Sequence, residues 1–173
     1  FVIHAMLFGG FGLVPWGVRI LDVVAILVMG RLIGRMATAD PKLRCAAGGI
    51  AALWCSGFYY TTFDYWATGQ AELWMALFLT GAAWAAWRVR AGGMWRTILC
   101  GALCGLAFLT KFTAIVPAAG IFLLGLVQAS NWACRARWAA GFLAGFAGAV
   151  LIVFLPFAFA GLASEAWQST VSI

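Results

Sequence analysis

Residues 31–44 read RLIGRMATADPKLR, and this basic segment lies between two long apolar stretches. Two further basic segments follow, at residues 88–96 and 135–137, and the three together hold nine of the eleven lysines and arginines. The intervening sequence is almost free of charge and is rich in Leu, Ala, Val, Ile, Phe and Trp. About 20 such residues suffice for a helix to cross a hydrocarbon core ~30 Å thick. The pattern predicts membrane-crossing helices joined by basic turns.

The basic turns also predict the orientation of the chain. Basic residues in short loops mark the cytoplasmic side of a membrane. If all three segments are cytoplasmic, the chain crosses the membrane twice between consecutive segments. The acidic residues Asp64, Glu72 and Glu165 then fall in the outward-facing turns. We expect residues 36–44, 88–96 and 130–138 inside, and residues 64–72 and 161–173 outside.

Composition favours the same class of protein. The chain is 65% hydrophobic and 9% charged, with a mean hydropathy of +1.01, whereas charged residues make up about 25% of soluble domains. Cytoplasmic basic turns account for nearly all of the net charge of +6, so nucleic acid is not an expected partner. The composition predicts a multi-pass membrane protein, and we expect it in the plasma (inner) membrane.

The expected fold is an all-α, polytopic transmembrane helix bundle in a single domain over residues 1–173. Residues 1–13 are too short to span the membrane, so they are either a truncated span or a short helix at the outer interface. Because the apolar sequence starts directly at Phe1, the chain is expected to be the N-terminal part of a longer protein, without its first span and first outer loop. We expect spans at about 16–31, 43–62, 70–88, 96–111, 113–128 and 138–160.

One stretch, residues 95–128, is ambiguous. A single helix of this length would measure about 50 Å, and it would put Arg135 and Arg137 on the outside, against the positive-inside rule. A break near Lys111 gives two shorter spans, which local thinning of the bilayer can accommodate. We therefore predict that the chain reverses direction between residues 109 and 116.

Small residues recur at spacings that allow helices to approach closely. Such GxxxG pairs permit tight helix packing in membranes. Cys100 and Cys104 share one helix face, but two thiols without a histidine or carboxylate make a poor metal site, so we interpret them as packing residues. The glycine pairs are Gly30/Gly34, Gly101/Gly105 and Gly141/Gly145.

The remaining ionisable residues all map to the outer half of the membrane or to the outer turns. Charge within or beside hydrocarbon is costly, and it usually faces a bundle interior or a wet cavity. Transporter sites lie closer to the midplane, so this distribution favours an enzyme with an outward-opening site. Apart from Asp40 in a basic turn, these residues are His4, Arg19, Asp22, Asp64, Glu72, Lys111 and Glu165.

Lys111, Asp64 and Glu72 are the main candidates for a site. Lys111 ends a short apolar helix, where it either snorkels to the interface or holds an anionic group such as a lipid phosphate. Asp64 and Glu72 bracket an outer turn, and they are either solvated or act on a substrate hydroxyl or a divalent cation. Arg19 and Asp22 stand at i and i+3, which favours a local ion pair, and His4 is a weak ligand candidate.

The run Gly101-Ala-Leu-Cys-Gly-Leu-Ala-Phe-Leu-Thr-Lys111, followed by Pro117, resembles a pattern common in GT-C glycosyltransferases. So do Val18-Arg19 opening a span, the basic stretch 31–44, and Asp64 with Gln70-Ala-Glu72 opening the next inward helix. The family includes protein O-mannosyltransferases and the transferase that adds aminoarabinose to lipid A. The resemblance covers essentially all 173 residues in order and spacing.

The resemblance implies an inverting transferase that passes a sugar from a polyprenyl-phosphate carrier to a lipid, glycan or protein acceptor on the outer face. Lys111, with Gln70 and Arg19, would bind the donor. Asp64 or Glu72 would orient the acceptor, the sugar or a divalent cation. In this family the main catalytic Asp lies on the first large outer loop, which would precede Phe1, so residues 1–173 alone are expected to be inactive.

Two other classes remain open. A transporter or flippase for a lipid-linked substrate would also need outward-facing charges, but it should carry a polar residue in mid-span. A non-catalytic membrane subunit would only pack against partners, and Asp64, Glu72 and Lys111 would then be unimportant.

Overall fold

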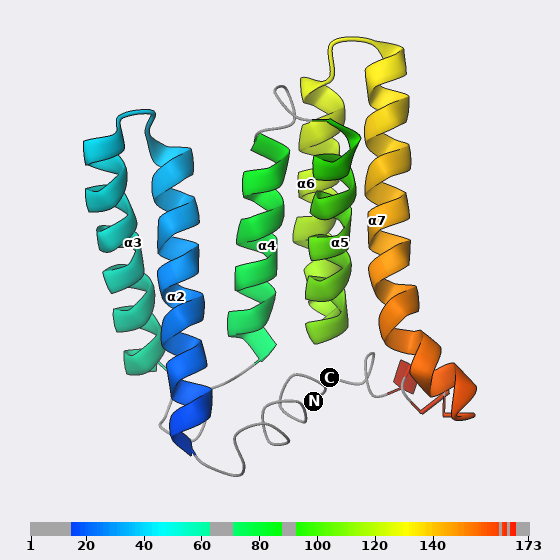
Figure 1. Ribbon diagram of the computed structural model, residues 1–173, viewed down its shortest axis with the longest axis horizontal. Helices are drawn as coiled ribbons and strands as arrows, with labels where there is room; N and C mark the ends of the chain where they lie inside the picture. Colours follow the sequence, from blue (N-terminus) through cyan, green and yellow to red (C-terminus); the bar gives the residue numbers. More distant parts are fainter. Residues whose placement is uncertain (1–14, 63–70, 88–92, 163, 166, 169–173) are drawn as a thin grey trace. The chain divides into compact units, whose positions relative to one another are not determined.

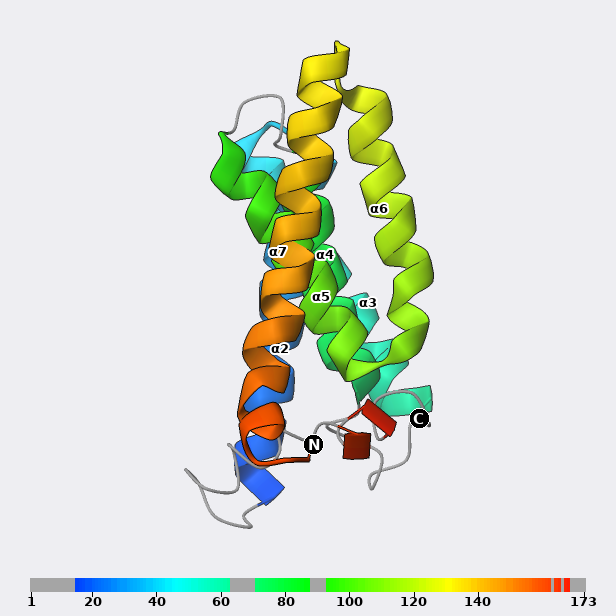
Figure 2. The same cartoon turned by 90° about the vertical axis from the view of Figure 1, so that its right-hand side faces the viewer.

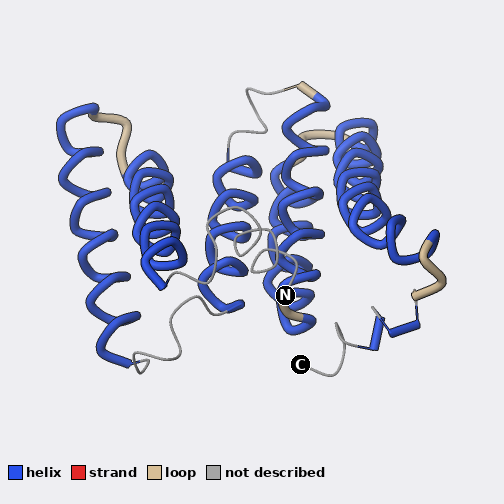
Figure 3. Tube along the Cα trace, turned by 60° about the horizontal axis from the view of Figure 1, so that its bottom comes forward, coloured by secondary structure: helices blue, strands red, loops and turns tan. Residues whose placement is uncertain are grey.

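The computed structural model describes residues 15–62, 71–87, 93–162, 164–165 and 167–168. Every regular element in these ranges is a helix, and no strand occurs among them (Figure 3). The all-helical fold expected from the sequence is therefore confirmed for the described residues. The elements are α2 (Pro15–Ala37), α3 (Pro41–Thr62), α4 (Ala71–Trp87), α5 (Met94–Thr110), the 3-10 helix η3 (Phe112–Ala114), α6 (Ile115–Gln128) and α7 (Trp132–Phe159).

The basic turns are shorter than the sequence predicted, because the helices extend into them. Only residues 38–40 separate α2 from α3, and α7 begins at Trp132 rather than near residue 138. Side-chain caps start both downstream helices. An oxygen of Asp40 accepts the backbone N–H of Lys42 at 2.9 Å, and Asn131 accepts that of Cys134 at 2.8 Å, as N-cap residues do. The basic side chains therefore project largely from helix ends.

One helix among the described residues, α7, is long and apolar enough to cross a membrane. The segments Met94–Thr110 and Phe112–Gln128 are apolar but shorter. Helix α2 has 23 residues, but Arg19, Asp22 and Arg31 interrupt its apolar sequence. A helix with the length and composition to cross a membrane is thus present among the described residues, while the six-span arrangement stays a prediction.

Contacts divide the chain into two compact units, Phe1–Leu73 and Trp74–Ile173. In the first unit, α2 and α3 form an antiparallel hairpin (Figure 1). A Cβ added to Gly30 would lie 2.6 Å from the carbonyl oxygen of Gly48 and 2.8 Å from the Cβ of Ala52. One added to Gly34 would lie 2.9 Å from the backbone nitrogen of Gly48. The Gly30/Gly34 pair therefore lets the two backbones approach closely, as the sequence predicted.

In the second unit, α5 and α7 pack through both of the other glycine pairs (Figure 2). A Cβ on Gly101 would overlap the backbone of Phe142, and one on Gly105 would lie 2.8 Å from the carbonyl oxygen of Phe146. Conversely, a Cβ on Gly145 would overlap the carbonyl group of Ile98. Gly101, Gly105 and Gly145 each face the backbone of the other helix, and Gly141 faces the side chains of Met94 and Thr97. This arrangement confirms the predicted close packing.

Small side chains also join α4 to α5. Ala82, Ala85 and Ala86 of α4 are buried against Cys100 and Cys104 of α5. The thiol of Cys100 donates to the carbonyl oxygen of Ala82 at 3.3 Å. Both thiols are fully buried, and this packing agrees with the role expected for them.

Trp138 attaches α6 to α7. Its indole is 2% exposed, lies over Gly125 of α6 and donates to the carbonyl oxygen of Phe122 at 3.0 Å. Its ring also contacts Phe142 at a centroid distance of 5.9 Å. A buried indole N–H needs such an acceptor, so this bond fixes the register between the two helices.

Candidate functional site

The helical segment is interrupted and the chain reverses direction at Lys111, within the interval predicted from the sequence. Helix α5 ends at Thr110, and Lys111 adopts an extended backbone with φ −157° and ψ 126°. The 3-10 helix η3 follows, and α6 then runs antiparallel to α5 (Figure 2). The predicted reversal is confirmed, and it places a half-buried lysine between two apolar helices.

Hydrogen bonds define the backbone at this break. The N–H of Lys111 donates to the carbonyl oxygen of Ala107 at 3.1 Å, and its own carbonyl accepts the N–H of Ala114 at 3.0 Å. The hydroxyl of Thr110 also donates to the carbonyl oxygen of Ala107, at 2.6 Å. Since Ala114 is fully buried, the turn is held on both sides of the lysine.

An aromatic cluster attaches the same turn to α7. Phe108 is 7% exposed, and its ring lies 5.5 Å from that of Phe112 and 5.6 Å from that of Phe146. Tilted ring pairs at such distances are stabilising beyond their buried area. The cluster joins the last turn of α5, the 3-10 helix and α7, so the segments on either side of Lys111 are held to α7 through Phe108.

Glu72 lies in the first turn of α4 and is half-buried. A carboxylate at this position is stabilised by the positive end of the helix dipole, which is the structural role considered for it above. By its contacts Glu72 belongs to the first unit, whereas Lys111 belongs to the second. The expected convergence of Glu72 and Lys111 on one cavity therefore stays a prediction.

The other candidates divide between α2 and residues outside the described ranges. Arg19 lies in the first turns of α2, and its side chain lies outside the described part, while His4, Asp64 and Gln70 fall outside the described residues altogether. Asp22 is fully buried in α2. The sequence suggested Asp22 only as a partner of Arg19, because spacing on one helix carries no information about what covers the side chain.

The described residues do not form a cluster of metal ligands. Among the described residues, no group of three or more His, Cys, Asp and Glu side chains is placed to hold an ion. Glu165, beyond the end of α7, is fully exposed, and its own backbone N–H and the Ser164 hydroxyl hold the pKa of its carboxyl group below the ordinary value. The divalent cation that the sequence suggested for Asp64 or Glu72 stays a prediction.

Comparisons with protein-family models, with curated proteins and with solved structures found no match for this chain. The class that the described residues define is therefore an all-helical protein with a helix able to cross a membrane. Its distinctive feature is the lysine at the break between α5 and α6.

Proposed function

We propose that the chain is part of a polytopic membrane glycosyltransferase that takes a sugar from a polyprenyl-phosphate carrier and passes it to an acceptor on the outer face. The observation that carries the proposal is the half-buried Lys111 at the break between two apolar helices. An ammonium group at the end of an apolar hairpin is well suited to a phosphate whose lipid tail lies in the membrane.

The packing of the second unit supports this role for Lys111. A lysine that only snorkels needs no particular backbone conformation. Lys111, by contrast, is itself the extended residue between Thr110 and η3, and it adjoins the Phe108 cluster. Positioning a charge on a rigid scaffold reduces the reorganisation needed when a leaving phosphate develops charge. Lys111 would therefore stabilise the departing carrier phosphate.

The remaining residues take supporting roles in the proposal. Asp64 or Glu72 would orient the acceptor, the sugar or a divalent cation, and Gln70 and Arg19 would contribute to donor binding. Glu72→Gln is then expected to lower turnover more than it lowers the amount of folded protein in the membrane. The proposal requires the multi-pass topology, since only that topology brings the outer turns and Lys111 to one side.

The topology can be checked by labelling single cysteines with a membrane-impermeant thiol reagent. The five native cysteines are first replaced by alanine or serine, and Gly92→Cys and Ser164→Cys are then introduced separately. We expect residue 164 to react in intact cells and residue 92 to react only after permeabilisation, because basic turns stay cytoplasmic. Reaction of residue 92 from the outside would refute the proposed orientation.

Activity is tested with membranes that contain the intact protein and a radiolabelled polyprenyl-phosphate sugar. Release of the unglycosylated carrier phosphate reports transfer, and membranes with the Lys111→Ala protein at equal abundance serve as the comparison. Lys111-dependent release supports the transferase. Movement of the intact lipid-linked sugar across the bilayer without its cleavage would instead favour the transporter alternative.

A further inference from the structure

The ends of α6 and α7 that face away from Lys111 line an open apolar groove of about 440 Å³. Leu123, Leu126 and Val127 line it from α6, and Trp132 and Ala139 line it from α7. Its volume falls within the range of about 300–1,000 Å³ that is usual for small-molecule sites. The groove lies wholly within the second unit and is separate from the turn that holds Lys111.

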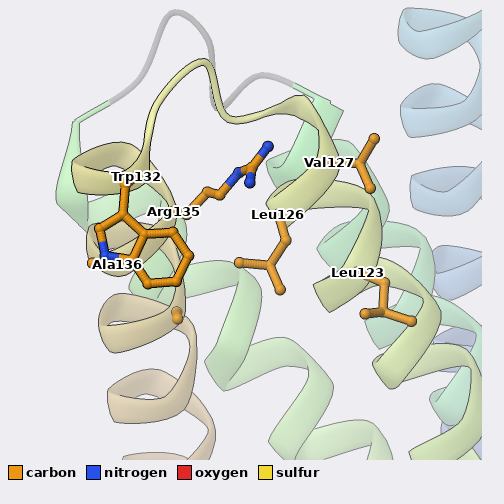
Figure 4. A pocket seen from close by; sticks show the side chains of 7 residues that line it. Leu123, Leu126, Val127, Trp132, Arg135 and Ala136 are labelled. Atoms are coloured by element: carbon orange, nitrogen blue, oxygen red, sulfur yellow. The ribbon is translucent and has the colours of Figure 1, made fainter.

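One positively charged side chain lines this groove. Arg135, in the first turns of α7, is the charged residue among its lining residues. In Figure 4 its guanidinium group reaches from α7 toward α6, and Leu126 projects from α6 back toward α7. A guanidinium group offers paired donors that match a phosphate, and the amino end of α7 adds positive partial charge nearby.

The exposed residues around the groove indicate what covers it. Trp132 is 80% exposed, Val127 78% and Leu123 58%, although each is large and apolar. Leaving such side chains in water is unfavourable, whereas tryptophan is enriched where hydrocarbon meets lipid headgroups. An apolar groove that ends at an arginine matches the two parts of a phospholipid, an acyl chain and a negatively charged headgroup.

We propose that this groove binds one anionic phospholipid of the cytoplasmic leaflet, with an acyl chain between α6 and α7 and the phosphate on Arg135. Basic pockets between membrane helices on the cytoplasmic side are suited to such headgroups. The α6 residues that line the groove lie 12 to 16 residues beyond Lys111, which is roughly 18–24 Å along the helix axis at 1.5 Å per residue. The inference rests on the proposed membrane topology and is independent of the proposed transferase activity.

Native mass spectrometry of the intact protein tests this site. The protein is reconstituted into nanodiscs with equal amounts of phosphatidylglycerol and phosphatidylcholine, released, and examined for retained lipid. We expect about a fivefold preference for one phosphatidylglycerol molecule, since one basic side chain near an anionic surface contributes an effect of this order. Arg135→Gln should abolish the preference, and Ala139→Trp should reduce retention of both lipids by filling the groove.

Two variants serve as matched controls. Arg137→Gln removes the same charge from an exposed arginine two residues away that does not line the groove, and Ala144→Trp adds the same bulk at an exposed position further along α7. Both should bind lipid as the unmodified protein does.

Several outcomes would overturn the proposal. These are equal retention of the two lipids, an Arg137→Gln effect as large as that of Arg135→Gln, or unchanged retention in Ala139→Trp. Displacement of the lipid by millimolar glycerol phosphate would show that the acyl chain does not occupy the groove. Preferential retention of a polyprenyl phosphate at Arg135 would likewise show that this lipid, and not a phospholipid, occupies the groove.

Discussion

Replacing Lys111 with alanine is expected to lower transfer from a polyprenyl-phosphate sugar by about 100-fold or more at unchanged protein abundance. Removing one preorganised electrostatic contact to a developing negative charge costs about 10²–10³ in turnover. The lysine is half-buried at the end of α5, next to Phe108 and the 3-10 turn. In the alanine variant, water at this position would therefore stabilise the phosphate charge less than the ammonium group does. Release of carrier phosphate by membranes containing the intact protein measures the effect.

Lys111→Arg is the matched variant for this test. It keeps the charge but changes the shape of the donor group, so we expect it to retain part of the activity. Thr110→Val is a second comparison, since it removes the hydroxyl that bonds to Ala107 without removing a charge. Transfer at a normal rate by the Lys111→Ala protein would exclude Lys111 from the mechanism and would favour a non-catalytic membrane subunit.

Gly101→Ala is expected to destabilise the second unit by about 3 kcal/mol, which is the upper end of the usual cost of overpacking. The added methyl group would overlap the backbone of Phe142 in α7, and backbone cannot move aside by changing a rotamer. Gly145→Ala should have a similar effect, because its methyl group would overlap the carbonyl group of Ile98. Thermal unfolding of the purified protein in detergent, followed by size-exclusion chromatography, measures both.

Gly148→Ala and Gly120→Ala are the controls for the glycine substitutions. A Cβ at either position meets no atom within 4 Å, although both glycines lie in helices, α7 and α6. Alanine is favoured over glycine within helices by about 1 kcal/mol, so these variants should be as stable as the unmodified protein or slightly more so. Equal destabilisation at Gly101 and Gly148 would contradict the packing described for α5 and α7.

Local sequence signals predicted the helices and the helix packing of this chain. Apolar length and the basic segments placed the α-helices α2 to α7, although not the 3-10 helix η3, and the positive-inside argument located the reversal at Lys111. The three GxxxG pairs predicted close helix packing, and the structure shows that they bring α2 to α3 and α5 to α7. These features depend on residues near one another in sequence, and a glycine that admits a neighbouring helix is visible without knowing which helix it is.

The limits of the helices were less predictable, because capping depends on single side chains. The hydropathy pattern predicted that α3 and α7 begin later in the sequence than they do. Asp40 and Asn131 start these helices earlier, because their side chains accept hydrogen bonds from backbone N–H groups. Arg44 adds two bonds in the opposite direction, since its guanidinium group donates to the carbonyl oxygens of Thr38 and Ala39. Averaging over an apolar window cannot detect such local bonds.

By itself the sequence determined an apolar, all-helical chain, its basic helix ends, its glycine contacts and the reversal at Lys111. Only the tertiary structure decided that Asp22 is fully buried, that the Phe108 cluster supports the Lys111 turn, and that Arg135 stands beside an apolar groove. The physical reason is that burial and cavities arise between helices. They depend on side chains from two or more segments whose relative rotation no periodicity within one segment specifies.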